Sequence, residues 1–367
     1  MLKFIYSIVL LTLLGLASCG DDDKIVTVEK VDLLRFDFPQ GNDPWDREIE
    51  QIAKDWGMYI IYKGVDSTHL NRRWTIPQYN EPIYVCSTPS SEDIQVYLNL
   101  VKEWLLGNLD KNKASDRSQL PVYLYLVNNL LDGNPHSPTY KRGHISLKKD
   151  GMDFWCLSFM SEELAAGLTP EMIHNIACSF SYPGLKARFL SGEYKIADDF
   201  AYMSDYDSPI GIRYYSLEDW LQDNPWFQKD DYEYMVAPWE RDAYNVYQKR
   251  GFVPQLRDDF RIDDFNDFFG PTYGAPLWMP LIEYDYEYSP LILPSPEERP
   301  LLDFLNLIRT AMRYPETQIR GTYPTDVEDP MEQYGNQLIN DKYDLVVKYM
   351  QTTYGINLQK YAEILTR

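Results

Sequence analysis

The sequence predicts an α+β protein in which a mixed N-terminal sheet with interleaved helices is followed by a mainly helical C-terminal half. Two patterns carry this prediction. Short β-rich segments alternate with helical periodicity up to about residue 159, and only amphipathic helical periodicity recurs after about residue 300. The length of 367 residues and the 44% of hydrophobic side chains are enough for a sizeable core.

The first eighteen residues form a targeting segment. Lys3 gives a short positive region, and the apolar run over 4–16 is too short to span a bilayer comfortably. The run ends in Leu16-Ala17-Ser18-Cys19, which resembles the bacterial lipobox. We therefore expect residues 1–18 to be removed as a lipoprotein signal peptide and Cys19 to be acylated. An ordinary secretory peptide with a coincidental cysteine is the alternative.

Three aspartates, residues 21–23, directly follow Cys19. They resemble the export signal that places lipoproteins on the outer face of the outer membrane in certain Gram-negative anaerobes. A solvated tether is the plainer interpretation, and both can hold together. Two or three acyl chains on Cys19 would anchor the protein stably. We therefore expect a lipid-anchored protein that lies on the outer membrane and faces the cell exterior. Residues 19–40 would be tether and lead-in, with 25–35 extended, and residues 41–367 would be a single domain.

In the N-terminal half, helix-start signals and β-rich runs alternate. Asp43-Pro44 opens a helix that reaches about Gly57, and Ser90 and Asp93 stand at capping-box spacing for a helix that ends near Asn108. A third helix is expected over 161–166. The β-rich runs predict four strands, of which the first is expected to be central: 58–63, 121–127, 143–147 and 153–159.

The C-terminal half is predicted to be helical after a less regular stretch over 184–234. Amphipathic or capped segments predict five helices: 238–251, 256–269, 301–313, 329–354 and 358–365. Between them, residues 270–300 are rich in proline, tyrosine and tryptophan. We interpret this stretch as an ordered aromatic insertion rather than a disordered linker.

The helix expected to begin at Thr169-Pro170 carries a motif that resembles a catalytic zinc-binding motif. Thr169 suits the N-cap and Pro170 the first helical turn, and apolar residues then recur at helical spacing. His174 and Cys178 are four residues apart and therefore project from the same side of this helix. A zinc metalloprotease helix reads His-Glu-x-x-His. This chain reads His-Asn-Ile-Ala-Cys. The spacing of the motif is therefore present, but the glutamate that acts as general base and the second zinc-binding histidine are not.

These features together resemble the zinc-binding metallopeptidase family of outer-membrane lipoproteins, whose fold is zincin-like and whose members are often encoded beside TonB-dependent importers. The pieces that carry the resemblance are the lipobox, the helix from Asp43 into 58–63, the strand at 121–127, the His174 helix, and Gly251-Phe252-Val253 followed by Asp263-Asp264-Phe265-Asn266-Asp267. The resemblance extends from about residue 40 to the C-terminus.

The resemblance implies a degenerate metal site. His174 matches the first zinc ligand, Cys178 stands in place of the second histidine, and Asp267, with Asp264 beside it, matches the third ligand. Asn175 occupies the position of the general base, and an amide cannot take a proton from a metal-bound water. A thiolate can bind zinc. The alternative for Cys178 is that it is only a small buried side chain in the core, and the alternative for the aspartates is that they form a solvated helix face. We therefore expect no cofactor, with zinc as the alternative.

Composition limits the partners. The formal net charge of −21 and the absence of a basic patch argue against nucleic-acid binding. Tyrosine occurs 30 times, and its rings suit peptide or sugar surfaces. The candidate ligand-contact aromatics lie in the insertion: Trp278, Tyr284, Tyr286 and Tyr288. Padding of the fold is the alternative for these rings.

The function expected from these features is that of an accessory or ligand-binding subunit of a TonB-dependent nutrient uptake system. Its partners would be the importer, the importer's lipoprotein lid, and an oligopeptide or oligosaccharide. The alternatives are an active zinc metallopeptidase or another hydrolase with a non-standard site, and a purely structural lipoprotein. A disulfide among Cys86, Cys156 and Cys178 stays open, since the sequence has no C-x-x-C pair.

Overall fold

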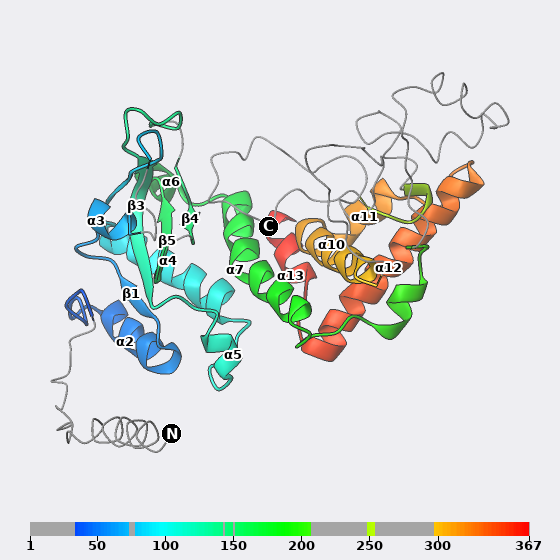
Figure 1. Cartoon of the computed structure of the whole chain (residues 1–367), viewed down its shortest axis with the longest axis horizontal. Helices are drawn as coiled ribbons and strands as arrows, with labels where there is room; N and C mark the ends of the chain where they lie inside the picture. Colours follow the sequence, from blue (N-terminus) through cyan, green and yellow to red (C-terminus); the bar gives the residue numbers. More distant parts are fainter. Residues whose placement is uncertain are drawn as a thin grey trace, which may run out of the picture.

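The computed structural model describes residues 34–72, 78–141, 144–149, 151–206, 248–253 and 297–366. Within these ranges the predicted α+β architecture is confirmed: a mixed sheet with helices precedes a helical half (Figure 1). The predictions for 1–33, for most of 238–251, for 256–269 and for nearly all of the aromatic insertion lie outside the described residues.

The described residues contain one five-stranded sheet, made of β1 (Tyr59–Ile61), β2 (Tyr84–Ser87), β3 (Tyr123–Asp132), β4 (Leu147–Lys148) and β5 (Phe154–Phe159). The order is β1-β3-β5-β4, and β2 pairs with β3. Strands β1, β3 and β5 run parallel, whereas β2 and β4 join antiparallel, so the sheet is mixed.

Two strand predictions need correction, and one strand was not predicted. The segment 58–63 is not central: β1 lies at the edge, and β3 holds the centre through its pairing with β1, β2 and β5. Ile60 and Ile61 are both fully buried, and burial of both faces cannot distinguish an edge strand from a central one. The strand predicted at 143–147 is reduced to β4, which has two residues. The unpredicted strand is β2, which has only four residues, none of them fully buried.

Three helices of the N-terminal half begin within one residue of the predicted starts: α2 (Pro44–Trp56), α4 (Ser91–Leu100) and α6 (Ser161–Ala166). Two short helices, α3 (Ser67–Leu70) and α5 (Ala114–Arg117), were not predicted. In α4, the Ser90 hydroxyl accepts from the N–H of Asp93 (3.2 Å), and the Asp93 carboxylate accepts from the N–H of Ser90 (2.8 Å). The helix then widens into a π-helical segment, η1 (Val101–Leu106), rather than continuing as α-helix to residue 108.

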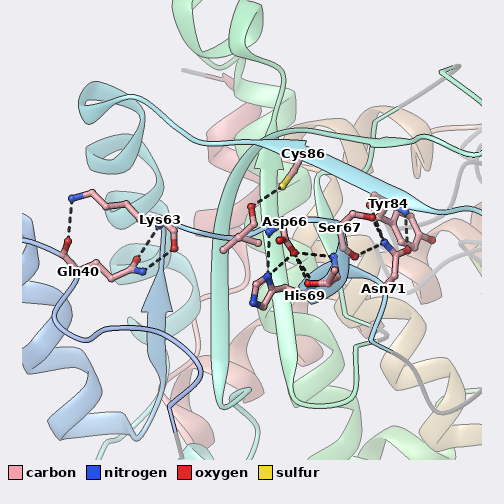
Figure 2. A network of polar contacts seen from close by, with 10 residues as sticks. Gln40, Lys63, Asp66, Ser67, His69, Asn71, Tyr84 and Cys86 are labelled. Carbon is pink, nitrogen blue, oxygen red and sulfur yellow. Dashed lines mark hydrogen bonds and ion pairs between the residues drawn. The ribbon is translucent and has the colours of Figure 1, made fainter.

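Side-chain amides tie the short elements near β1 together (Figure 2). Asn71 donates to the carbonyl of Tyr84 (2.9 Å) and accepts from its N–H (2.8 Å), which fixes α3 against β2. Gln40 does the same for the backbone of Lys63, accepting from its N–H (2.9 Å) and donating to its carbonyl (2.8 Å). At the end of each short strand, the side-chain amide makes the backbone hydrogen bonds that a neighbouring strand would otherwise make.

The helical half contains α10 (Arg299–Arg313), α11 (Glu316–Thr322), α12 (Pro330–Tyr354) and α13 (Gln359–Ala362), with the short 3₁₀ segments η2 (Asp198–Tyr202) and η4 (Glu363–Thr366). A fully buried ion pair joins α10 to α12: the ammonium of Lys342 lies 2.7 Å from the carboxylate of Asp303. The Tyr206 hydroxyl donates to the same carboxylate (2.8 Å), so the buried charge is hydrogen-bonded from two sides.

One cluster of buried apolar side chains runs through both halves, from Ile49 in α2 to Ile364 in η4. A smaller cluster covers the other face of the sheet around Tyr125 and Cys156. No helix in the described ranges is both long enough and apolar enough to cross a membrane.

Replacing Tyr97 by Phe tests the junction of α4 with the sheet. The buried Tyr97 hydroxyl accepts from the N–H of Phe159 (2.9 Å) and donates to the carbonyl of Val127 (2.7 Å). Loss of the hydroxyl removes both hydrogen bonds from a buried position, so we expect the free energy of unfolding to fall by about 1–3 kcal/mol in urea titrations. The matched control is Tyr202→Phe, since Tyr202 is 89% exposed; equal stability of the two variants would contradict the role given to Tyr97.

Candidate functional site

Helix α7 (Pro170–Leu190) carries the predicted motif and lies between the sheet half and the helical half (Figure 1). Its start follows the expected signals: the Thr169 hydroxyl accepts from the N–H of Met172 (3.3 Å), and Pro170 occupies the first turn. The helix continues to Leu190. The prediction of an irregular chain from residue 184 was therefore wrong for 184–190.

His174 is buried at the contact of α7 with α10. Its Nε2 lies 2.9 Å from the carbonyl oxygen of Met312, near the end of α10. A carbonyl oxygen only accepts, so Nε2 carries a proton and donates it. Burial lowers the pKa of His174, while its hydrogen bonds with the Met312 carbonyl and the Asn175 side chain act in the opposite direction. The ring is neutral at pH 7 and joins two helices.

Cys178 lies one turn further along α7, as the spacing predicts. Its Sγ is 3.4 Å from Nε2 of His174 and 4.0 Å from the carbonyl oxygen of Met312. The side chain is fully buried, and burial raises the pKa of the thiol well above its usual range. The contacts are those of a protonated, buried thiol. Cys86, Cys156 and Cys178 are all free thiols, and none forms a disulfide.

The contacts of His174 do not fit a zinc ligand acting through Nε2. A zinc-bound imidazole gives a nitrogen lone pair to the metal, but Nε2 holds the proton that it donates to Met312. Within the described part of the chain, no three His, Cys, Asp or Glu side chains lie close enough together to hold a metal ion. Asp267, the expected third ligand, lies outside the described residues. The proposed ligand set as a whole therefore stays a prediction.

Pro183 stands inside α7 and has no N–H for the carbonyl of Ser179, four residues earlier. The ammonium of Lys149, in the connection between β4 and β5, donates to that carbonyl instead, at 2.5 Å. The same ammonium lies 4.3 Å from the ring centroid of Trp155 in β5. Lys149 thus supplies the missing hydrogen bond and ties α7 to the sheet half.

A cavity of about 230 Å³ lies where this contact is made, between η1, β5, α7 and the region of α13. Its walls are mostly apolar and include Leu105, Leu120, Trp155, Phe180, Leu185 and Ile356. A few polar groups converge on it: Asn108, Gln119, Lys149, Ser181, Arg188 and Tyr361. An apolar cavity with few polar groups at the junction of two halves is typical of a small-ligand site.

The polar groups on one side of the cavity form a directed chain. Lys360 donates to the amide oxygen of Asn108 (2.5 Å), whose NH₂ donates to the hydroxyl of Tyr361 (2.6 Å). Tyr361 donates to Ser181 (2.8 Å), which donates to the carbonyl of Trp104 (3.2 Å). Burial lowers the pKa of Lys360 and raises that of Tyr361. The chain fixes these side chains and holds α13 against α7.

Sequence reasoning missed the groups that line this cavity. Asn108, Lys149, Ser181 and Tyr361 come from four separate segments, and no local pattern connects them. One signal was present: a proline inside a helix leaves a carbonyl that needs an external donor. The predicted lipidation residue Cys19 and the aromatics Trp278, Tyr284, Tyr286 and Tyr288 lie outside the described residues.

No protein-family model matches the chain, and no curated protein matches it. Among solved structures, the chain is similar to one described as a "putative zinc-binding metallo-peptidase from Bacteroides caccae". The sequence identity is 12% and the TM-score is 0.37, with 89% of this chain and 94% of that chain covered. A likeness this distant carries no argument about the chemistry of the site.

Replacing His174 by Gln tests the neutral state of the imidazole. The pKa of His174 is lowered in the folded state from about 6.5 in the unfolded chain, so below that pH the unfolded state binds the extra proton. The wild type should therefore lose stability as the pH falls from about 6.5 through the lowered folded pKa, and the variant should lose less. Urea titrations across this range measure both proteins.

The pKa of His144 is also lowered by burial, but His144 is present in both proteins and its contribution cancels in the difference. A wild-type minus variant difference that does not change with pH would contradict the assignment to His174.

Proposed function

We propose that this protein is a lipid-anchored, exterior-facing outer-membrane lipoprotein that binds a ligand without catalysis, as an accessory subunit of a TonB-dependent uptake system for peptides or glycans. The proposal combines the outer-membrane location that the N-terminal sequence implies with the contacts that His174 and Cys178 make on α7. The importer and its lipoprotein lid are the proposed partners.

The hydrogen bond between His174 and Met312 is the observation that carries the non-catalytic part. Nε2 donates to the α10 carbonyl at 2.9 Å, and the Cys178 thiol fills the space beside it. A hydrolytic zinc site needs an imidazole that faces the metal and a position open to water. Here the imidazole joins two packed helices, and His174 is 2% exposed.

Asn175 supports the same conclusion. Its side chain hydrogen-bonds the His174 ring. An amide neither takes up nor releases a proton in the accessible pH range, and loss of a general base typically lowers the rate by about 10²–10⁴. In this chain the base position has become part of the support for the imidazole.

The anchoring part rests on the sequence. Cys19 ends a lipobox-like run, and Asp21, Asp22 and Asp23 follow it directly. Two or three acyl chains hold a protein stably on a membrane, whereas a single chain does not. The net charge of −21 keeps such a protein soluble on its tether and away from nucleic acids.

Metal analysis of the purified, lipidated full chain tests the non-catalytic part. We expect substoichiometric zinc and no chelator-sensitive cleavage of a mixed peptide library, because Nε2 of His174 already donates to Met312. The His174→Gln variant should behave identically in both assays. Stoichiometric zinc with chelator-sensitive cleavage that this variant abolishes would instead establish an active metallopeptidase with a non-standard site.

Membrane fractionation of the wild type and of Cys19→Ser tests the proposed location in the outer membrane. We expect the wild type in the outer-membrane fraction, accessible to added protease on intact cells, and the variant released from it, because the acylated thiol is lost. Cys86→Ser is the matched control, since Cys86 belongs to β2.

A pull-down with the native lipidated protein should recover a TonB-dependent channel; recovery of no channel from cells that make one would contradict the uptake role.

A further inference from the structure

The cavity beside α7 has room for one aromatic side chain. Its volume of about 230 Å³ exceeds that of an engineered apolar cavity of about 150 Å³ that takes up benzene. Two aromatic residues, Trp155 and Phe180, line it together with aliphatic ones. Ala187 also lines it and is exposed, so the cavity opens to the surface beside the last turn of α7. A large side chain can therefore enter while the rest of its chain stays outside.

The charged groups in the cavity wall are engaged with other parts of the protein. The guanidinium of Arg188 pairs with Asp116 and donates to the Tyr194 hydroxyl (2.6 Å). The ammonium of Lys149 donates to the Ser179 carbonyl of α7 (2.5 Å). No carboxylate occurs among the described residues that line the cavity. The wall therefore favours an uncharged ligand, whose binding requires neither cation to give up its partners.

The hydroxyl and amide donors on one side of the wall are also satisfied within the protein. The Asn108 NH₂ donates to the hydroxyls of Tyr361 (2.6 Å) and Ser181 (3.4 Å). Tyr361 donates to Ser181 (2.8 Å), and Ser181 donates to the Trp104 carbonyl (3.2 Å). A sugar ring would bring several hydroxyl groups into a mostly apolar wall whose polar side chains are already bonded, which is costly. The wall therefore favours an apolar peptide side chain over a glycan.

One hydrogen-bond acceptor in the wall stands apart from this network. The Gln119 NH₂ donates to the Ser115 carbonyl (3.1 Å), which identifies the other end of the amide as the oxygen. Among the described residues, none donates a hydrogen bond to that oxygen. The oxygen lies against Gly184 of α7, where a Cβ would collide with it. Gln119 and Gly184 both line the cavity, so its wall holds an amide oxygen that can accept one donor from a ligand.

We propose that this cavity binds a neutral aromatic side chain that carries one hydrogen-bond donor, as tryptophan does in an oligopeptide. The ring lies among the apolar walls, and its N–H donates to the Gln119 amide oxygen. The inference names the ligand class of the proposed function and rests on its ligand-binding role. Free indole is the other source of the same chemistry, and its affinity distinguishes the two sources.

Calorimetry on the full chain with N-acetyl-Gly-Trp-Gly-amide tests the proposal. The comparison peptide carries 3-benzothienylalanine, which has the shape of tryptophan but a sulfur in place of the N–H. Wild-type protein should bind the comparison peptide at least about fivefold more weakly, because the Gln119 oxygen then lacks its donor. Gln119→Met keeps the length of the side chain but removes the acceptor, so this variant should bind the two peptides equally.

Gly184→Ala tests the position of the oxygen without removing it. The added methyl group displaces the Gln119 oxygen, so the preference for the tryptophan peptide should fall. The thermal midpoint should stay at or above that of the wild type, since alanine favours a helix more than glycine does. Gln95→Met is the matched control for Gln119→Met: Gln95 is exposed on α4, and its replacement should leave both affinities unchanged.

Four outcomes would overturn the inference: no binding of the tryptophan peptide to folded protein, equal binding of the two peptides by the wild type, an undiminished preference in both cavity variants, or at least about tenfold tighter binding of free indole than of the peptide. The last outcome would assign the cavity to a small free ring. The zinc analysis and the importer pull-down do not depend on these results, so failure here is distinguishable from failure of the proposed function.

Discussion

The burial of α7 between the two halves is the constraint on which the rest of the structure depends. A helix in this position must satisfy its polar groups toward both neighbours, since little water reaches them. Toward the sheet half, Lys149 donates to the Ser179 carbonyl that Pro183 leaves without a partner in the helix. Toward the helical half, His174 donates to the Met312 carbonyl of α10. Each bond joins a side chain of one layer to the backbone of the next.

The same principle governs the other buried charges. Lys342 and Asp303 pair between α12 and α10, and Arg188 of α7 pairs with Asp116 of α5. Removing one member of such a pair leaves an uncompensated charge, which is far more costly than exchanging the whole pair for apolar residues. These pairs therefore restrict which elements can pack together, and Arg188, held by Asp116, forms part of the cavity wall beside α7.

The candidate site shows how far local patterns reach. Thr169, Pro170 and the four-residue spacing of His174 and Cys178 predicted where α7 begins and which side chains share a face, and the structure agrees. The partner of His174 could not be predicted, because Met312 is 138 residues away in the chain. The cavity was equally hidden, since its polar groups come from segments that meet only after folding.

By itself, the sequence determined the features that depend on near neighbours: the capped starts of α2, α4, α7 and α12, their apolar faces, and the order of a mixed sheet before a helical half. The tertiary structure decided what depends on distant partners. It placed β1 at the edge of the sheet, widened the end of α4 into η1, and carried α7 through Pro183 to Leu190. Capping and periodicity are read over a few residues, whereas these outcomes follow from hydrogen bonds and burial supplied by remote segments.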